Sequence, residues 1–426
     1  MRPITHEMQV RRRIGFVSTR FEGTDGVSLE SEKWVNVLER LNCDCFFFAG
    51  ESDRSADRSY IVEEANFKHP EIKEINNVAF STRIRPPELT RKIQNNKELL
   101  KNKLYDFTRV YALDLLIVEN ALAIPMNIPL GLALTEFIAE TGIPVIAHHH
   151  DFFWERKRFL VNCVWDYMNM AFPPHLPSVR HVVINSSGAN QLSLRTGISS
   201  IVIPNVMDFE NPPSTPDLES SDIRRDLQVE ADEWFFLQPT RVVPRKGIEH
   251  AIELTRRLGM KARLVISHAS GDEGYEYEHY LRENANLLGV KVNFVSDIIG
   301  TKRNFSETAR VYALYDIYPH ADLVTYPSDI EGFGNAFLEA VYFKRPIIVK
   351  NYTIYDIDIK PKGFRAIEFD GFITENTINQ TCEVLNNPGL AMEMAEHNYM
   401  VARRHYSYKV LERCLNTLLS ECFGEE

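Results

Sequence analysis

Two glutamates eight positions apart, Glu331 and Glu339, flank a glycine-containing loop in the stretch SDIEGFGNAFLEAVYFKRPIIV. The loop carries Gly332 and Gly334 and follows DLVTYP, an apolar run that is typical of a buried strand. Glycines let backbone N–H groups approach an anion closely, and carboxylates accept hydrogen bonds from hydroxyl groups. Because a carboxylate repels a phosphate group, we expect both glutamates to face hydroxyl groups of a ligand.

A basic counterpart lies in TRVVPRKGIEHAIEL, where Arg241, Arg245 and Lys246 end an apolar run just before a predicted helix. Fixed cations beside a helix start make a good diphosphate site, because the cations and the helix dipole attract the same negative charge. The alternative is a solvated basic turn. Cations for a diphosphate and acids for a polyol, within one domain, describe a site for a nucleotide sugar. The N–H groups of Phe333 and Gly334 would then meet its anionic part.

Two further loops follow apolar runs in the first half of the chain. The loop Gly23-Thr24-Asp25-Gly26 does not match the dinucleotide fingerprint, so a plain turn and a phosphate loop both stay open. The run IPVIAHHHD ends in three histidines, the last of them His150. Because neighbours on a strand point to opposite faces, the three cannot all bind one ion. We expect one functional or structural histidine there and no metal.

Other polar residues at strand ends are candidates for binding a second, small polar substrate. Glu119 and Asn120 end the apolar run LDLLIVEN, and Asn127 follows them. The residues WERKR after His150 either recognise a phosphorylated or carboxylated substrate or form an ordinary helix face. Asp356 and Asp358 are interpreted as loop acids that bind no metal, since the fixed cations already offset a diphosphate.

The composition of the chain limits the classes of protein to which it can belong. Its 426 residues favour two domains, and 44% hydrophobic and 25% charged residues are typical of a globular protein. A net charge of −11 argues against a dedicated nucleic-acid binder. No run is apolar enough for a membrane span or a signal peptide, and the six cysteines lack zinc-site spacing. We expect a cytoplasmic protein with reduced thiols.

Short apolar runs alternate with amphipathic segments along the chain, which predicts parallel sheets covered on both faces. The pattern breaks after Asn205 in a stretch rich in proline, serine and acids, as expected of an inter-domain connection. We therefore expect two Rossmann-like domains, at 1–210 and 225–400. Residues 401–426 read as a single C-terminal helix that packs back toward the first domain.

These motifs resemble those of the family 4 glycosyltransferases, which have the GT-B fold, and the resemblance spans nearly the whole chain. The family's motifs appear as E-x7-E at Glu331 and Glu339, R-x4-K-G at Arg241 and Lys246-Gly247, HD at His150-Asp151, and IPN at Ile203-Pro204-Asn205. The resemblance implies an α/β protein, with two Rossmann-like domains whose parallel sheets face a central cleft. One departure is that Asp25-Gly26 stands where the family has a glycine pair.

The resemblance also implies roles for individual residues. Arg241 and Lys246 would hold the donor diphosphate, Glu331 would contact the transferred sugar, and Glu339 would bind the ribose. The remaining donor contacts would come from Gly26 and from the backbone of Phe333, Gly334 and Asn335. His150 would lie near the reacting sugar, and the acceptor contacts would come from Asp25, Glu119, Asn120 and Asp151.

We therefore expect a retaining enzyme that moves a hexose, glucose or mannose, from a UDP- or GDP-hexose, with no metal and no tightly bound cofactor. The expected acceptor is a hydroxyl of a small polar molecule, such as a sugar phosphate or a glycerate-type solute precursor. A donor phosphate oxygen would take the acceptor proton; a double displacement through Glu331 is the rival mechanism. Alternatives are a lipid-linked or polysaccharide acceptor, a GT-B phosphorylase and a non-catalytic sugar-nucleotide sensor. The oligomeric state is left open.

Overall fold

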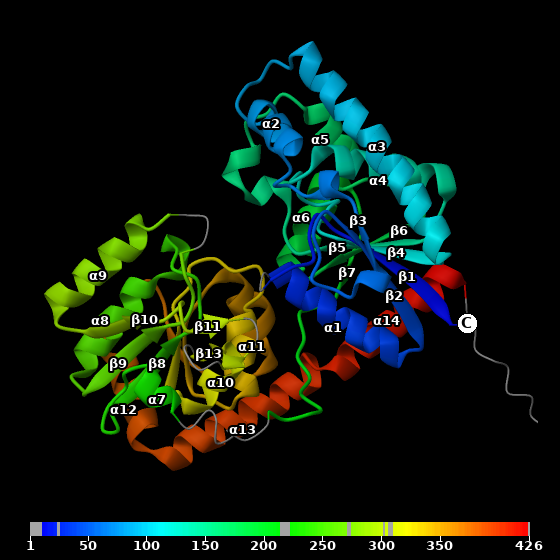
Figure 1. Cartoon of the computed structure of the whole chain (residues 1–426). Coiled ribbons are helices and arrows are strands. Elements are labelled where there is room, and N and C mark those ends of the chain that lie inside the picture. The colour runs from blue at the N-terminus through cyan, green and yellow to red at the C-terminus, as the bar shows by residue number, and fades with distance from the viewer. Residues whose placement is uncertain are drawn as a thin grey trace, which may run out of the picture. The chain divides into compact units, whose positions relative to one another are not determined.

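The structure, a computed structural model, describes residues 11–23, 26–213, 222–270, 274–300, 303–305 and 310–424. The chain divides into two compact units (Figure 1). Unit 1 comprises Met1–Pro204 and Leu411–Glu426, and unit 2 comprises Asn205–Val410. The expected functional domains, at 1–210 and 225–400, stay predictions, and Asp25 lies outside the described residues.

Unit 1 is built on a seven-stranded sheet of order β3-β2-β1-β4-β5-β6-β7, in which every described pairing is parallel. The apolar runs of the sequence form its strands, because buried parallel strands need apolar side chains on both faces. The strand order reverses between β1 and β4. The strands are β1 (Arg12–Val17), β2 (Cys43–Ala49), β3 (Ser59–Ile61), β4 (Leu115–Glu119), β5 (Val145–His149), β6 (Val179–Val183) and β7 (Ile201–Val202).

Helices cover both faces of this sheet. One core cluster joins α3 and α4 to the sheet through Phe107, Leu130 and Val118, whereas Trp34 of α1 packs against His148 of β5 on the opposite face. The helices of unit 1 are α1 (Gly26–Arg40), α2 (Pro70–Ala79), α3 (Pro87–Tyr111), α4 (Ile128–Thr141), α5 (Trp165–Ala171), α6 (Ser186–Thr196) and, from Leu411 onward, α14 (Tyr408–Phe423). Short 3-10 helices lie at Ala56–Arg58, Glu63–Ala65, Phe153–Glu155 and Lys157–Phe159.

Unit 2 contains a six-stranded parallel sheet of order β10-β9-β8-β14-β15-β16, whose order reverses between β8 and β14. A small sheet of order β11-β13-β12 accompanies it. The strands of the larger sheet are β8 (Trp234–Gln238), β9 (Ala262–Ile266), β10 (Lys291–Phe294), β14 (Leu323–Tyr326), β15 (Ile347–Lys350) and β16 (Ile367–Phe369). Those of the smaller are β11 (Ile299–Gly300), β12 (Asn304–Phe305) and β13 (Arg310–Ala313).

The core of unit 2 lies between the six-stranded sheet and helices α8, α9 and α12, as shown by the buried residues Ile252, Leu264, Leu281 and Ile378. The helices are α7 (Ile223–Asp226), α8 (Ile248–Leu258), α9 (Glu276–Leu288), α10 (Leu314–Ile317), α11 (Asn335–Tyr342), α12 (Glu375–Asn386) and α13 (Pro388–His405). Short 3-10 helices lie at Pro244–Lys246, Tyr318–His320 and Lys360–Lys362, and a π-helical turn lies at Tyr355–Ile359.

The expectation of one continuous C-terminal helix over 401–426 is wrong. Helix α13 ends at His405, and α14 begins at Tyr408. Between them, Ser407 forms a parallel bridge with Met207, and the Met207 N–H donates to the Tyr406 carbonyl at 2.9 Å. The backbone at this point therefore pairs with a distant segment instead of continuing the helix.

Candidate active site

The residues singled out by the sequence follow strands at or next to the two points where strand order reverses. In unit 2, Lys246 lies in the loop after β8, and Glu331 lies in the loop after β14. In unit 1, Glu119 ends β4 and His150 follows β5. Ligands of open parallel sheets bind beyond the carboxyl ends of the strands at such points. The fold thus brings the predicted residues to the expected edge of each sheet.

Lys246 and Glu331 form a largely buried ion pair, with 2.5 Å between Nζ and Oε1. The side chains are only 11% and 10% exposed, respectively. Burial lowers the pKa of Lys246, although the Glu331 carboxylate acts in the opposite direction. The ammonium also lies 5.7 Å from the centroid of the Tyr326 ring. Two residues expected to hold different parts of one ligand are therefore in direct contact.

The turn that carries Lys246 depends on Gly247. This glycine has a φ of +57°, and a Cβ atom there would lie 2.4 Å from the Pro327 carbonyl oxygen. The close approach brings the loop after β8 against the chain that leaves β14. A larger residue would force the two loops apart, and with them Lys246 and Glu331.

Arg241 has an exposed side chain, and in the described part of the chain its guanidinium makes no hydrogen bond or ion pair. The Arg241 charge nevertheless contributes to lowering the pKa of His268, a residue that the sequence analysis missed. Burial, followed by the charges of Lys246 and Arg241, lowers the pKa of His268 to about 4. His268 comes directly after Ser267, beyond the carboxyl end of β9, so this edge of unit 2 is electropositive.

The buried side chain of Tyr352 fixes the glycine loop before α11. Gly334 has a φ of +133°, and a Cβ atom there would lie 2.2 Å from the Tyr352 hydroxyl oxygen. That hydroxyl donates to the Phe333 carbonyl at 2.9 Å. Among the described residues, no hydrogen bond uses the N–H groups of Phe333 and Gly334. At the first position of α11, the Asn335 Oδ1 accepts from Asn205 Nδ2 at 2.7 Å.

Glu339 lies one turn into α11 and is anchored from a different segment. The hydroxyl of Tyr318 donates to its Oε2 at 2.7 Å. Tyr318 is fully buried, and burial together with the Glu339 charge raises its pKa far above the ordinary value, so the hydroxyl keeps its proton. Tyr318, Tyr326 and Tyr352 were missed by sequence reasoning; the signal they offered was tyrosine at or near the ends of predicted strands.

In unit 1, the Glu119 carboxylate lies between two histidines. Its Oε2 is 3.0 Å from His148 Nδ1 and 3.1 Å from His150 Nε2. His149 points to the opposite face of the sheet, where its Nε2 lies 2.9 Å from His181 Nδ1. The predicted alternation along this strand is confirmed. Glu119 is fully buried, so the expected direct contact with an acceptor stays a prediction that its burial does not favour.

The other acceptor candidates bind one another. Asn120 Oδ1 accepts from the His150 N–H, and Asn120 Nδ2 donates to Asp151 Oδ1, each at 3.0 Å. Asp151 also pairs with Arg156 at 2.5 Å. Asn127 instead caps α4 and donates to the Glu64 carbonyl, so its proposed contact with a small molecule is replaced by a structural role.

The remaining predictions have mixed outcomes. Gly26 is the exposed first residue of α1, beside the expected phosphate loop. The segment after His150 forms two short 3-10 helices, and both the substrate-binding and the helix-face interpretation of its charged residues stay predictions. Asp356 and Asp358 lie in a π-helical turn and not in a loop, and the interpretation that they bind no metal stays a prediction.

One group within the described residues has the donor set for a metal ion. Candidate ligand atoms of Glu119, His148 and His150 all lie within 4.8 Å of one another. The six cysteines are free thiols, and none belongs to this group. None of the described helices is both long and apolar enough to cross a bilayer.

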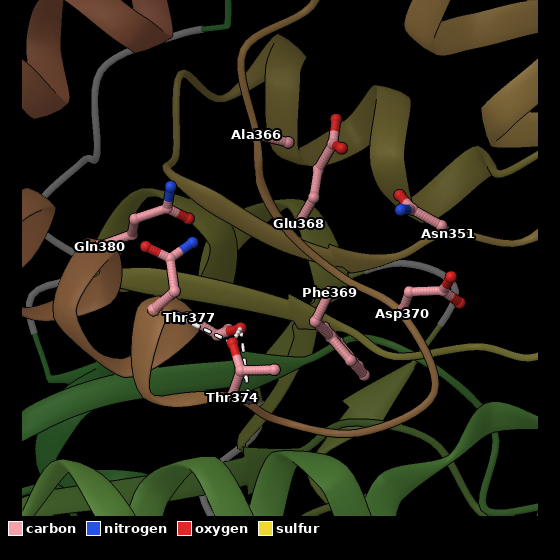
Figure 2. Close-up of a pocket in the computed structure, with 9 residues that line it drawn as sticks. Asn351, Ala366, Glu368, Phe369, Asp370, Thr374, Thr377 and Gln380 are labelled. Atoms are coloured by element: carbon pink, nitrogen blue, oxygen red, sulfur yellow. Dashed lines mark hydrogen bonds between the residues drawn. The ribbon is translucent and has the colours of Figure 1, made fainter.

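A separate pocket of about 430 Å³ opens in unit 2 at the carboxyl ends of β15 and β16, beside the start of α12 (Figure 2). Polar side chains dominate its wall, and Thr374, which caps α12, lies at one side. It contains none of the residues of the glycine loop or the basic loop.

Comparison with known proteins decides the family. The chain is 30% identical to the mannosylglucosylglycerate synthase of Thermotoga maritima, over 92% of this chain and 96% of that protein. It is 31% identical to the enzyme of the same name from Petrotoga mobilis, over 83% and 86% of the two chains. Residues 219–384 also match the model of the glycosyl transferases group 1. The chain belongs to the group 1 glycosyltransferases.

The fold of this glycosyltransferase is GT-B. A crystal structure of Anabaena HepE in complex with UDP-glucose superposes with a TM-score of 0.64 at 13% identity, over 96% of this chain and 99% of that one. The resemblance to family 4 and the expectation of two parallel α/β sheets are therefore confirmed, as is the assignment as a transferase. The roles of the individual site residues stay predictions.

Proposed function

We propose that this glycosyltransferase moves a mannosyl or glucosyl group, with retention, from a nucleotide diphosphate sugar to a hydroxyl of a glycerate-type acceptor. One observation carries the proposal. The cations Arg241 and Lys246 and the carboxylates Glu331 and Glu339 lie beyond neighbouring strands, β8 and β14, where the order of one sheet reverses. Such an edge offers positive charge to a diphosphate and acceptor oxygens to the hydroxyl groups beside it.

In the proposed reaction, the bond between the anomeric carbon and the diphosphate oxygen breaks while the acceptor oxygen bonds to the same face of that carbon. The acceptor proton passes to an oxygen of the leaving diphosphate. Arg241, Lys246 and the backbone N–H groups of Phe333 and Gly334 stabilise the negative charge that develops there. These fixed donors take the part that a divalent cation would otherwise fill, so we expect turnover to be unchanged by a chelator.

The named product of the two relatives, mannosylglucosylglycerate, supports an acceptor of the glucosylglycerate class. Such an acceptor carries a carboxylate. In this chain two exposed cations, Lys157 and Arg158, lie in the segment that comes after His150 and could pair with that carboxylate. Exchange of Lys157 for Gln should therefore raise the KM for the acceptor several-fold and leave the KM for the donor unchanged. Lys103→Gln, an exposed lysine of α3, is the matched control.

A donor–acceptor matrix tests the proposal. UDP-glucose, GDP-glucose and GDP-mannose are each incubated with glucosylglycerate, glycerate, 3-phosphoglycerate or no acceptor, and free nucleoside diphosphate is measured. We expect release that depends on a glycerate-type acceptor, and the active pair identifies the nucleotide. NMR of the product should show the anomeric configuration of the donor, whereas an inverted product would overturn retention.

The same matrix separates the alternatives. Formation of a sugar phosphate from inorganic phosphate would indicate a phosphorylase, and nucleotide-sugar binding without turnover would indicate a sensor. Activity restricted to lipid-linked or polysaccharide acceptors would overturn the assignment of a small acceptor. A covalent glycosyl adduct on Glu331, detected by mass spectrometry after rapid quenching, would replace the single-step mechanism by double displacement.

A further inference from the structure

The buried Glu119 carboxylate has a position that binding of a solute does not explain. Its Oε2 faces His148 Nδ1 and His150 Nε2 at once, and neither carboxylate oxygen is accessible, since the residue has no exposed area. Oε1 is buried without a hydrogen-bond partner among the described residues. A carboxylate enclosed in this way acts on the side chains around it.

The sheet register produces this arrangement. Glu119, the last residue of β4, pairs in register with His148 of the parallel neighbour β5. Their side chains therefore leave the same face, and His150, two residues further along, leaves that face as well. Trp34 of α1 stacks on the His148 ring at 4.3 Å between centroids and is fully buried. The indole of Trp34 thus fixes the His148 ring. The His150 ring lies at the edge of the sheet, and its side chain is 10% exposed.

Proton positions follow from the acceptor that the two rings share. A carboxylate oxygen accepts hydrogen bonds, so His148 carries a proton on Nδ1 and His150 carries one on Nε2. Nδ1 is then the nitrogen of His150 that is left for a ligand. No hydrogen bond to this atom occurs within the part of the chain that the structure describes.

The charged groups around His150 act on its pKa in the direction opposite to burial. Burial opposes the charge, but the hydrogen bond and charge of Glu119, with further contributions from Glu30 and Asp151, raise the pKa of His150. Lys33 neutralises Glu30 at 2.9 Å, and Arg156 pairs with Asp151. Burial likewise works against the Glu119 anion, yet the two histidines lower the pKa of Glu119 to about 2.

The other face of β5 provides an internal contrast. His149 and His181 pair with each other and have no carboxylate partner among the described residues. Burial, followed by the neighbouring histidine, lowers the pKa of His149 far below its ordinary value. The two faces of β5 therefore differ in that the histidines of one face share a carboxylate and those of the other do not.

We propose that Glu119 is a positioning residue that accepts a hydrogen bond from His150 Nε2 and so orients the ring, leaving Nδ1 to face a hydroxyl group of the bound sugar. The inference rests on the proposed function for the identity of that ligand. In this inference Glu119 does not bind the acceptor directly but acts through His150. Trp34 and His148 brace the carboxylate from the other side.

The test compares Glu119→Gln with His181→Gln, which alters the buried histidine pair on the opposite face. In Glu119→Gln we expect kcat to fall about 10- to 100-fold with less than a threefold change in the donor KM, because the ring is bound less firmly in one orientation. His181→Gln should leave kcat unchanged. A Glu119→Gln variant with wild-type kcat, beside an active wild type, would overturn the inference and leave the proposed function standing.

A second readout needs no substrate. Correlation of ring nitrogens with ring protons by NMR, in the free protein and assigned with His150→Gln, should show the Nε2 proton of His150 in the wild type and its altered signal in Glu119→Gln. An unchanged His150 signal would overturn the inference whichever substrates prove active. One equivalent of a tightly bound divalent metal in the purified protein, with His150 signals that change on chelation, would overturn it in favour of a metal site. If Glu119→Gln does not fold, the wild-type spectrum with and without chelator decides.

Discussion

At the scale of single residues, the basic and acidic groups of unit 2 stabilise each other before any ligand arrives. Lys246 and Glu331 are in contact at 2.5 Å and are shielded from water, whereas Arg241 is exposed. A buried ion pair of this kind is stable only while both partners are present, because one charge left alone in the interior is strongly unfavourable. Substitutions here therefore affect folding and catalysis together, and the two effects must be measured separately.

Lys246→Met should lower turnover at least about 100-fold, the size expected for losing one preorganised charge at a developing anion. It should also lower the free energy of unfolding by about 3–5 kcal/mol, because Glu331 loses its partner. The double variant Lys246→Met/Glu331→Gln should recover stability and stay inactive. Urea unfolding and a saturating transfer assay measure the two effects.

The control for this pair is Lys261→Met, since Lys261 binds Glu230 and Asp232 at the surface. A surface pair contributes about 0–1 kcal/mol, so both measurements should stay near wild type. Near-normal turnover of Lys246→Met at saturating donor would remove Lys246 from the mechanism.

We expect Glu339 to bind the nucleotide part of the donor and Glu331 to contact its sugar. Glu339→Ala should weaken binding of UDP or GDP by about one to two decades, the loss expected for a charged hydrogen-bond partner of about 1.5–3 kcal/mol. Glu331→Ala should scarcely change that affinity and sharply impair transfer. Tyr318→Phe, which keeps the Glu339 carboxylate but removes its anchor, should give an intermediate loss. Calorimetry with the bare nucleotide is the measurement, and equal losses in Glu331→Ala and Glu339→Ala would contradict the division.

At the scale of helices and strands, the loops that carry function are shaped by contacts between elements. The main strands of both sheets were predictable because an apolar run between polar loops leaves few other solutions. The ion pair of Lys246 with Glu331 could not be predicted, because its partners are 85 positions apart in the sequence. The break between α13 and α14 was missed for the same reason, since its cause is the pairing of Ser407 with Met207. Sequence patterns are local, and these contacts are not.

Gly334 offers a test of one such loop. Gly334→Ala should lower the free energy of unfolding by about 1–3 kcal/mol, because the residue has a φ of +133° and its new Cβ would strike the buried Tyr352 hydroxyl. Donor affinity should fall with it, since the N–H groups of the loop would shift. Gly363→Ala is the matched control, with a φ of +94° and open space around the new atom. It should be destabilised by backbone strain alone and bind donor normally; reduced donor affinity in both variants would argue against a specific role of the loop.

At the scale of the whole molecule, buried neutral histidines link stability to pH. Burial, as the first cause, lowers the pKa of His181 and of His268 to about 4 each. One lies in the seven-stranded sheet of unit 1, and the other follows β9 in unit 2. Both units therefore contain a group that binds its proton more readily in the unfolded chain than in the folded one.

The free energy of unfolding should decline as the pH falls from about 6.5 toward 4, and the contribution of these groups should be fully present above pH 6.5. The sign follows because the unfolded chain takes up protons that the folded chain excludes over this interval. A pKa displaced from 6.5 to about 4 corresponds to about 3 kcal/mol. Urea unfolding at several pH values measures the decline, and His181→Gln should make it less steep in unit 1, where the lowered pKa of buried His149 supplies the remainder. An equally steep decline in that variant would contradict the assignment.

The division of unit 1 into Met1–Pro204 and Leu411–Glu426 has a consequence for how the protein is made. The ribosome delivers all of Asn205–Val410 before most of α14, whose Leu411, Leu415 and Leu418 are buried. At about 5–20 residues per second, that interval lasts roughly 10–40 seconds. Throughout it, unit 1 has its strands but lacks its last helix, while unit 2 emerges as one uninterrupted stretch. During synthesis, the unit begun first is therefore the unit finished last.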